Sequence, residues 1–285
     1  MEEIIIGNDK FEARIAQNGA ELQQLSRLVD GKNYIWTPIE QFWNRRAPNL
    51  FPIVGRLMRD RYLHNGNYYE LGQHGFARNS PFKIIKYQPN EVTLQLESDN
   101  KSFVVYPFEF QLLIHFKIVE NVLTVSAEIY NTGSEVLPFS YGAHPAFALE
   151  SPISNYSVRI SGKDKIQRRF LNEGIRIEQY GTIPLVKNTL MLDDELFIDD
   201  AIVLENQSIE KVDILENAEP YISVISEGNP YYGIWTKPGA PFLCLEPWWG
   251  IADSMDSNGE IMEKEGITKL EVNDKICHTY SIEMH

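Results

Sequence analysis

The stretch that decides the fold reads LLIHFKIVENVLTVSAEI, residues 112–129. Apolar side chains alternate with polar ones on both sides of Glu120-Asn121. Period-two alternation is typical of half-buried β-strands. We therefore predict a long antiparallel hairpin here, and its apolar face has these members: Leu112, Ile114, Phe116, Ile118, Leu123, Val125, Ala127 and Ile129.

The same period continues along the chain in both directions. Alternating runs occupy residues 4–15, 92–96, 157–160, 222–225 and 267–282. A second hairpin is predicted over 62–68, because Asn65-Gly66 favours a type I′ turn. Only 41–46 and the stretch at Asp253-Ser254 suit a helical turn or two. Strands without interleaved helices argue against a parallel α/β fold, so we predict an all-β protein with one antiparallel sandwich domain over 1–285.

Composition narrows the class of protein. The formal net charge of −14 disfavours nucleic acid or an anionic membrane surface as partner. No apolar run approaches the roughly 18 residues of a membrane span, and the first residues lack the pattern of a secretory signal. Cys244 and Cys277 lack CxxC spacing, so neither a disulfide framework nor a zinc site is expected. We expect a cytoplasmic protein with reduced thiols; its oligomeric state stays open, and a homodimer is one option.

Arginine is concentrated in one part of this acidic chain. Six arginines fall within residues 45–78: Arg45, Arg46, Arg56, Arg59, Arg61 and Arg78. They could form ordinary surface ion pairs. They could also form a local positive pocket for an oxygen-rich or anionic ligand.

Two histidines stand in unusual surroundings. His74 begins HGFAR, residues 74–78, and His144 lies in FSYGAHPAF, residues 139–147. Pro145 restricts the backbone of His144, and Gly142 permits close approach of another chain or a ligand. A single histidine in such a run is more often structural, so its meaning depends on its partners.

A carboxylate interrupts an apolar run in FLCLEPWWG, residues 242–250. An unpaired buried carboxylate is costly, so Glu246 should have a donor or a raised pKa. Trp248 and Trp249 suit the apolar faces of a sugar ring, whose hydroxyls the carboxylate would bind. The alternative is a salt bridge beside two core tryptophans.

Four motifs occur in order: NLFPIVGR at 49–56, HGFAR at 74–78, HPAF at 144–147 and EPW at 246–248. Together they resemble the aldose 1-epimerase (galactose mutarotase) family, in its divergent bacterial LacX-like branch. The resemblance runs from about residue 4 to 282. It implies a large antiparallel β supersandwich, in agreement with the periodicity.

The resemblance implies a site that needs no metal and no cofactor, with a small sugar or sugar phosphate as partner. Glu246 would be the general base on the anomeric hydroxyl, and His144 the general acid on the ring oxygen. His74 would bind near the ring oxygen. Two further residues would hold hydroxyls: Arg56 and Asp200, the latter with Asp199 as an alternative in register.

HGFAR is also shared with the hexose-6-phosphate mutarotase branch, in which the arginine helps to hold phosphate. Arg78 could therefore bind a substrate phosphate, assisted by Arg45 or Arg46. It could equally be a structural partner of a carboxylate. The resemblance specifies neither the sugar nor the need for phosphate.

Three other functions remain open at this stage. His74, His144 and Glu246 form a 2-His-1-carboxylate set, as in non-haem iron sites. Glu246 with Asp253 or Asp200 could form the carboxyl pair of a glycoside hydrolase. A non-catalytic carbohydrate-binding protein of the same fold would use the tryptophans and arginines without turning the sugar over.

Overall fold

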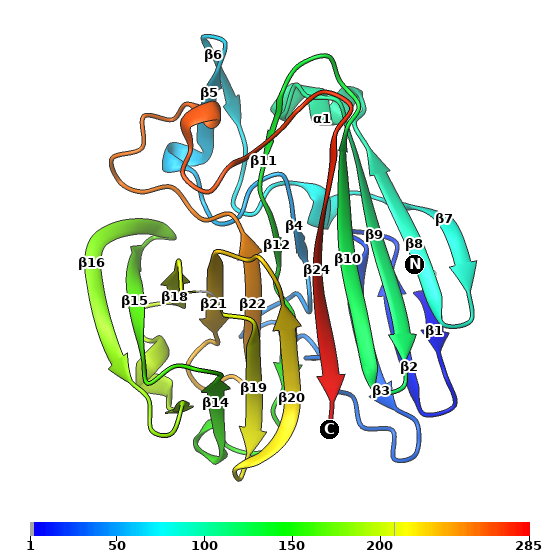
Figure 1. The fold of residues 1–285 in the computed structure, drawn as a ribbon, viewed down its shortest axis with the longest axis vertical. Coiled ribbons are helices and arrows are strands. Elements are labelled where there is room, and N and C mark those ends of the chain that lie inside the picture. The colour runs from blue at the N-terminus through cyan, green and yellow to red at the C-terminus, as the bar shows by residue number, and fades with distance from the viewer. Residues whose placement is uncertain (1–2, 208) are drawn as a thin grey trace.

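The fold is an antiparallel β supersandwich built around two large sheets. The computed structural model describes residues 3–207 and 209–285, and Figure 1 labels most of its strands. The nine-stranded sheet has the order β17 (Thr189–Met191), β14 (Tyr156–Ile160), β19 (Lys211–Glu216), β20 (Glu219–Ser226), β24 (Lys275–Met284), β10 (Val122–Asn131), β9 (Phe110–Val119), β8 (Glu91–Glu97) and β7 (Lys83–Gln88).

The eight-stranded sheet carries the motifs that the sequence singled out. Its order is β16 (Ile175–Pro184), β15 (Lys165–Asn172), β18 (Ile202–Glu205), β21 (Tyr231–Trp235), β22 (Phe242–Trp249), β12 (Tyr141–Ala143) and β4 (Asn49–Leu50), with β13 (Ala146–Ala148) also paired to β22. Three small sheets complete the fold: β1 (Glu3–Gly7), β2 (Phe11–Ala16) and β3 (Glu21–Arg27); β5 (Arg61–His64) and β6 (Asn67–Glu70); β11 (Leu137–Phe139) and β23 (Thr268–Leu270).

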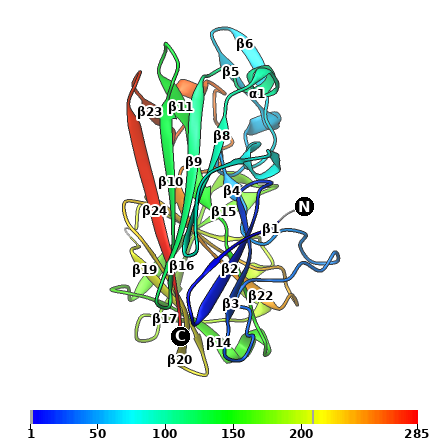
Figure 2. The ribbon, with the colours of Figure 1, turned by 90° about the vertical axis from the view of Figure 1, so that its right-hand side faces the viewer.

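The predicted hairpin at 112–129 is confirmed as β9 and β10. Their register pairs Leu123 with Ile118 and Ile129 with Leu112, and all eight predicted face residues are buried. Figure 2 shows β24, β10 and β9 side by side as one layer. The apolar side chains of these strands join those of β22, such as Leu243 and Leu245, in one core cluster. Burial of both faces against each other is what stabilises a sandwich.

The second predicted hairpin is confirmed as β5 and β6, and Asn65 and Gly66 both have positive φ (49° and 75°), as a type I′ turn requires. The five other alternating runs also contain strands: β1, β2, β8, β14, β20, β23 and β24.

The helical predictions were wrong. No helix forms over 41–46: the amide of Trp43 donates to the carbonyl of Ile39, which closes a single turn over 39–43. Ser254 forms an isolated β-bridge with Arg176. The α-helix that the structure does contain, α1 (Asn100–Val105), begins at a capping box in which Asp99 accepts from the amides of Lys101 and Ser102. The remaining helical segments are 3₁₀ turns: Met58–Asp60, Ala77–Asn79, Ile153–Asn155, Asp194–Phe197 and Ile261–Glu263. Within the described residues, no helix is both long and apolar enough to span a membrane.

His278 on β24 makes the stability of the fold sensitive to acid. Its ring stacks on Trp249 at 4.7 Å and lies parallel to that of Tyr141, and burial lowers its pKa from 6.5 to about 4. Between pH 6.5 and about pH 4, His278 therefore binds a proton in the unfolded chain but not in the folded chain. The free energy of unfolding falls as the pH falls through this range.

We expect His278→Phe to remove this acid sensitivity. Between pH 7 and pH 5 the wild type should lose about 2 kcal/mol more unfolding free energy than the variant. Urea unfolding at the two pH values measures the difference. Equal losses in the two proteins would show that His278 is not held neutral.

Candidate active site

A cavity of about 250 Å³ lies over the eight-stranded sheet, on the face turned away from the nine-stranded sheet. Val203, Glu246 and Trp248 line it, while their strand neighbours Leu204 and Leu245 belong to the core between the sheets. Successive side chains of a strand point to opposite faces. One set of residues therefore packs the core, and the alternate set builds the cavity.

The same alternation corrects the prediction for the tryptophan pair. Trp248 lines the cavity, but Trp249 points to the opposite face, where it stacks on Tyr141 and His278. Adjacent residues of one strand cannot both reach a single cavity. Of these two adjacent tryptophans, only Trp248 faces the cavity.

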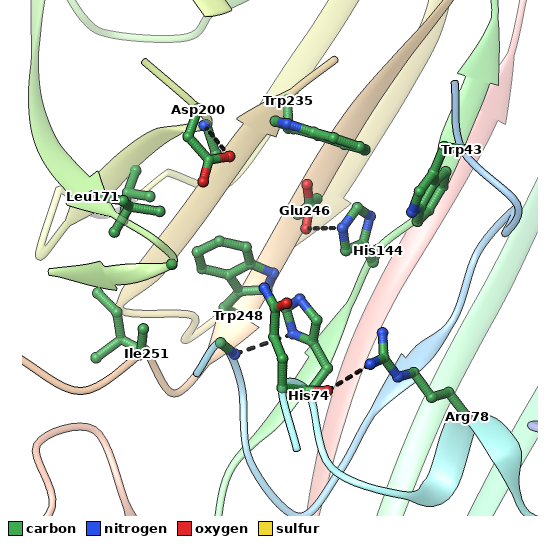
Figure 3. A pocket seen from close by; sticks show the side chains of 16 residues that line it. Trp43, His74, Arg78, His144, Leu171, Asp200, Trp235, Glu246, Trp248 and Ile251 are labelled. Carbon is green, nitrogen blue, oxygen red and sulfur yellow. Dashed lines mark hydrogen bonds and ion pairs between the residues drawn. The ribbon is translucent and has the colours of Figure 1, made fainter. Parts of the chain in front are cut away.

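Strand pairing places His144 directly opposite Glu246. β12 pairs Gly142 with Trp248, and β13 pairs Ala146 with Cys244, so the register continues through the gap between these two short strands. Residues directly opposite on antiparallel strands have side chains in contact. Nε2 of His144 lies 3.2 Å from Oε2 of Glu246, and a dashed line marks this contact in Figure 3.

Burial drives both members of this pair toward their neutral forms. Burial raises the pKa of Glu246 well above 4.5, with opposition from the nearby Trp248 indole and a further rise from Asp200. Burial also lowers the pKa of His144 to about 3. Burial in the free site therefore favours the carboxylic acid form of Glu246 beside a neutral imidazole. Perturbed groups that converge in a cavity are typical of acid–base sites.

His74 is fixed as a single tautomer. The amide of Gly55 donates to its Nδ1 at 3.1 Å, so the neutral ring carries its proton on Nε2. Burial lowers the pKa of His74 well below 6.5, and the neighbouring His144 adds to this effect. The rings of His74 and His144 meet edge to face, with centroids 5.8 Å apart. His74 is therefore a neutral hydrogen-bond donor on the cavity wall (Figure 3).

A steric constraint requires glycine at position 75 of the HGFAR motif. Gly75 has φ of +67°, and a Cβ at this position would lie 2.3 Å from the carbonyl oxygen of Phe51. Only glycine fits where one backbone approaches another so closely with positive φ. This contact fixes the loop that presents His74.

Arg78 lines the same cavity without a carboxylate partner among the described residues. One guanidinium NH₂ donates to the carbonyl of Gln73 at 2.6 Å, and Nε is buried without a hydrogen-bond partner. Burial lowers the pKa of Arg78 to about 10, and Arg45, which donates to the Arg78 carbonyl, contributes.

The other arginines of residues 45–78 do not join Arg78 on the cavity wall. Arg56 pairs in bidentate fashion with Asp60 (2.7 Å for each bond) and donates to the carbonyl of Glu173. The structure therefore does not bring Arg56 into the cavity as the resemblance implied. Arg61 lies over the ring of Tyr68. Of the six arginines, only Arg78 lines the cavity. Arg45 contacts the backbone carbonyl of Arg78.

Asp200 lines the cavity, and Asp199 does not. Arg168 holds this turn by donating to the carbonyls of both residues. Asp253, the other carboxylate considered for a glycosidase pair, is buried in an ion pair with Lys264 and does not line the cavity.

Two aromatic residues of the cavity wall are not among the predicted site residues. Trp43 stacks on His144 with centroids 4.8 Å apart and 25° between planes, and Trp235 meets the same imidazole edge-on at 5.8 Å. Figure 3 shows both indoles beside the acid–base pair. Trp43 lies in residues 41–46, for which the sequence predicts a helical turn. No sequence pattern indicates its contact with His144.

The side chains that could ligate a metal in the structure differ from the 2-His-1-carboxylate set considered as an alternative. Within the described residues, ligand atoms of His144, Cys244 and Glu246 lie within 4.8 Å of one another, and His74 is not in this cluster. Cys244 and Cys277 are both free thiols, as expected.

Comparison with known proteins identifies the family. The family model described as aldose 1-epimerase matches residues 2–266. The chain belongs to the aldose 1-epimerase family. This membership supports a role as a sugar epimerase or mutarotase, an isomerase with a small sugar as substrate.

The alignments of this aldose 1-epimerase family member with its relatives cover nearly the whole chain. It is 26% identical to the protein LacX of Lactococcus lactis subsp. lactis over 295 aligned residues, which cover 98% of each chain. Among solved structures, a galactose mutarotase related enzyme from Lactobacillus acidophilus is 29% identical with a TM-score of 0.95, covering 100% of this chain and 97% of that one. A galactose mutarotase-like protein from Lactobacillus casei is 28% identical with a TM-score of 0.92, with both chains covered completely. These comparisons confirm the predicted fold and family.

Proposed function

We propose that the protein is a mutarotase that interconverts the α- and β-anomers of an aldohexose or its phosphate, with Glu246 as base and His144 as acid. The observation that carries the proposal is the 3.2 Å contact between these two side chains inside a cavity that His74 also lines. A carboxyl group and an imidazole so placed can reach neighbouring oxygens of one sugar ring.

The reaction needs two proton transfers to open the ring. Glu246 takes the proton of the C1 hydroxyl while His144 gives one to the ring oxygen, and the C1–ring oxygen bond breaks to leave an aldehyde. Rotation about C1–C2 presents the other face of the aldehyde, and closure returns both protons. Each positioned acid or base contributes roughly 10²–10⁴-fold to such a rate.

The neutral pair of the free site is one proton transfer away from the reactive pair. Moving the Glu246 proton to Nε2 of His144 across their contact creates a carboxylate and an imidazolium. Sugar hydroxyls that bind the carboxylate favour this form, because hydrogen bonds to a charged group lower its desolvation cost. The Nε2–H of His74 supports the developing charge near the ring oxygen without changing its own protonation state.

The cavity walls suit a pyranose. Trp43, Trp235 and Trp248 offer apolar surfaces for the C–H faces of the ring, and Asp200 offers an acceptor for a hydroxyl. Apolar walls with a few placed polar groups are typical of small-molecule sites. We assign Trp248 and Asp200 to substrate binding on this basis.

Arg78 is the residue that should distinguish a sugar phosphate from an unphosphorylated sugar as substrate. We expect Arg78→Ala to slow anomer exchange of glucose 6-phosphate by at least tenfold while changing exchange of glucose and galactose much less, because a charge-assisted contact to phosphate is worth more than one to a hydroxyl. Two-dimensional exchange NMR of the anomeric signals measures all three rates.

Arg61→Ala is the matched control, since its guanidinium covers Tyr68 on the β5–β6 hairpin outside the cavity. Equal rates on the three sugars in Arg78→Ala would instead assign Arg78 a structural role. Sugar binding without any exchange in the wild type would favour the alternative function, a carbohydrate-binding protein of this fold.

A further inference from the structure

Cys244 is a buried thiol that the proposed reaction does not use. It lies two residues before Glu246 on β22, so both side chains leave the strand on the same face. Cys244 therefore packs with Trp36 and Phe242 near the acid–base pair, and not in the core between the sheets, where Leu243 and Leu245 lie.

The atoms around this thiol form an incomplete coordination shell. Ligand atoms of His144, Cys244 and Glu246 fall within 4.8 Å of one another, and all three residues are buried. In the described part of the chain, Oε2 of Glu246 makes no hydrogen bond of good geometry, although Nε2 of His144 lies 3.2 Å away. A buried polar atom without a well-formed hydrogen bond is costly, and a cation bound by this carboxylate oxygen would satisfy it.

We propose that His144, Cys244 and Glu246 bind a thiophilic divalent cation such as Zn²⁺, and that the bound ion inhibits the enzyme by occupying the acid–base pair. One nitrogen, one sulfur and one carboxylate oxygen are donor types that Zn²⁺ prefers, and three protein ligands leave a fourth position for water. Bonds of about 2.0–2.3 Å place tetrahedral ligand atoms about 3.5 Å apart. Nε2 of His144 and Oε2 of Glu246 are already 3.2 Å apart, and no pair of ligand atoms exceeds 4.8 Å, so only a small closure is needed.

Binding requires that protons leave the site. The Cys244 thiol and the Glu246 carboxyl each release a proton to solvent, while the neutral His144 imidazole donates a lone pair. The affinity for Zn²⁺ should therefore rise with pH. Inhibition rests on the proposed function, whereas binding of the ion does not.

The binding test uses Co²⁺ as a spectroscopic probe of the full-length protein. A thiolate ligand gives Co²⁺ a near-ultraviolet charge-transfer absorption, which we expect in the wild type. Cys244→Ser should abolish it. Cys277→Ser, which changes the exposed free thiol on β24, is the matched control and should retain it. Cys244→Ala replaces Cys244→Ser if the serine variant does not fold.

The inhibition test is anomer exchange with increasing Zn²⁺. Inhibition should be competitive with the sugar, and loss of the thiol ligand in Cys244→Ser should raise the inhibitory Zn²⁺ concentration at least tenfold. The inference is overturned if the wild type shows no cobalt–thiolate absorption, or if the absorption follows Cys277. Absorption that depends on Cys244 in a protein without exchange activity would retain the metal site and reject the proposed function.

Discussion

Glu246→Gln should slow anomer exchange by about 10²–10⁴-fold, the contribution of one positioned base. Glutamine keeps the volume of the side chain and its place on β22, but it cannot take the proton of the C1 hydroxyl. Exchange NMR with the sugar that the wild type turns over fastest measures the loss. Because burial raises the pKa of Glu246, the substitution removes a neutral acid from the free site, so stability should be nearly unchanged.

His144→Asn provides the companion measurement. It removes the acid and should cost a similar factor. The double variant should lose little more than either single variant, because residues that act as a unit have non-additive effects. Native rates in both single variants would show that the contact between His144 and Glu246 is structural.

Lys264→Met should destabilise the fold by about 3–5 kcal/mol, because it leaves a buried carboxylate without its partner. The side chains of Lys264 and Asp253 are 3% and 4% exposed, and their charged atoms lie 3.3 Å apart. Burial lowers the pKa of Lys264, although Asp253 acts to raise it. Chemical denaturation at pH 7 measures the change in unfolding free energy.

The same ion pair supports the cavity wall. Oδ2 of Asp253 accepts from the amide of Met58, and its amide donates to the carbonyl of Arg56. These bonds hold the segment that begins at Gly55, whose amide fixes His74. Lys264→Met should therefore also reduce activity under conditions in which the protein remains folded.

Two variants test this explanation. Adding Asp253→Asn to Lys264→Met removes the stranded charge and should restore part of the stability. Lys275→Met breaks a shorter but exposed ion pair with Glu128, at 2.7 Å, and should change stability far less. Similar losses for Lys264→Met and Lys275→Met would mean that burial of the pair does not decide its contribution.

Local patterns in the sequence were sufficient to predict the fold class. The alternation over 112–129 specifies which side chains face the core, and Asn65-Gly66 specifies a hairpin turn, because both depend on nearest neighbours along one strand. The helical predictions at 41–46 and 253–254 failed, since short polar and aromatic runs do not distinguish a turn from a helix.

The sequence by itself determined the sandwich, the family and the chemical types of the site: two histidines, a carboxylate in an apolar strand and a tryptophan after it. Only the tertiary structure decided how they combine. The register of β22 against β12 and β13 places His144 opposite Glu246. The face of β22 that borders the cavity carries Trp248, and the opposite face places Trp249 in the core. The ion pair with Asp60 holds Arg56 outside the cavity. The physical reason is that these contacts join residues far apart in the chain. Which of them meet depends on how separate strands align with one another, and a pattern within one strand does not specify that alignment.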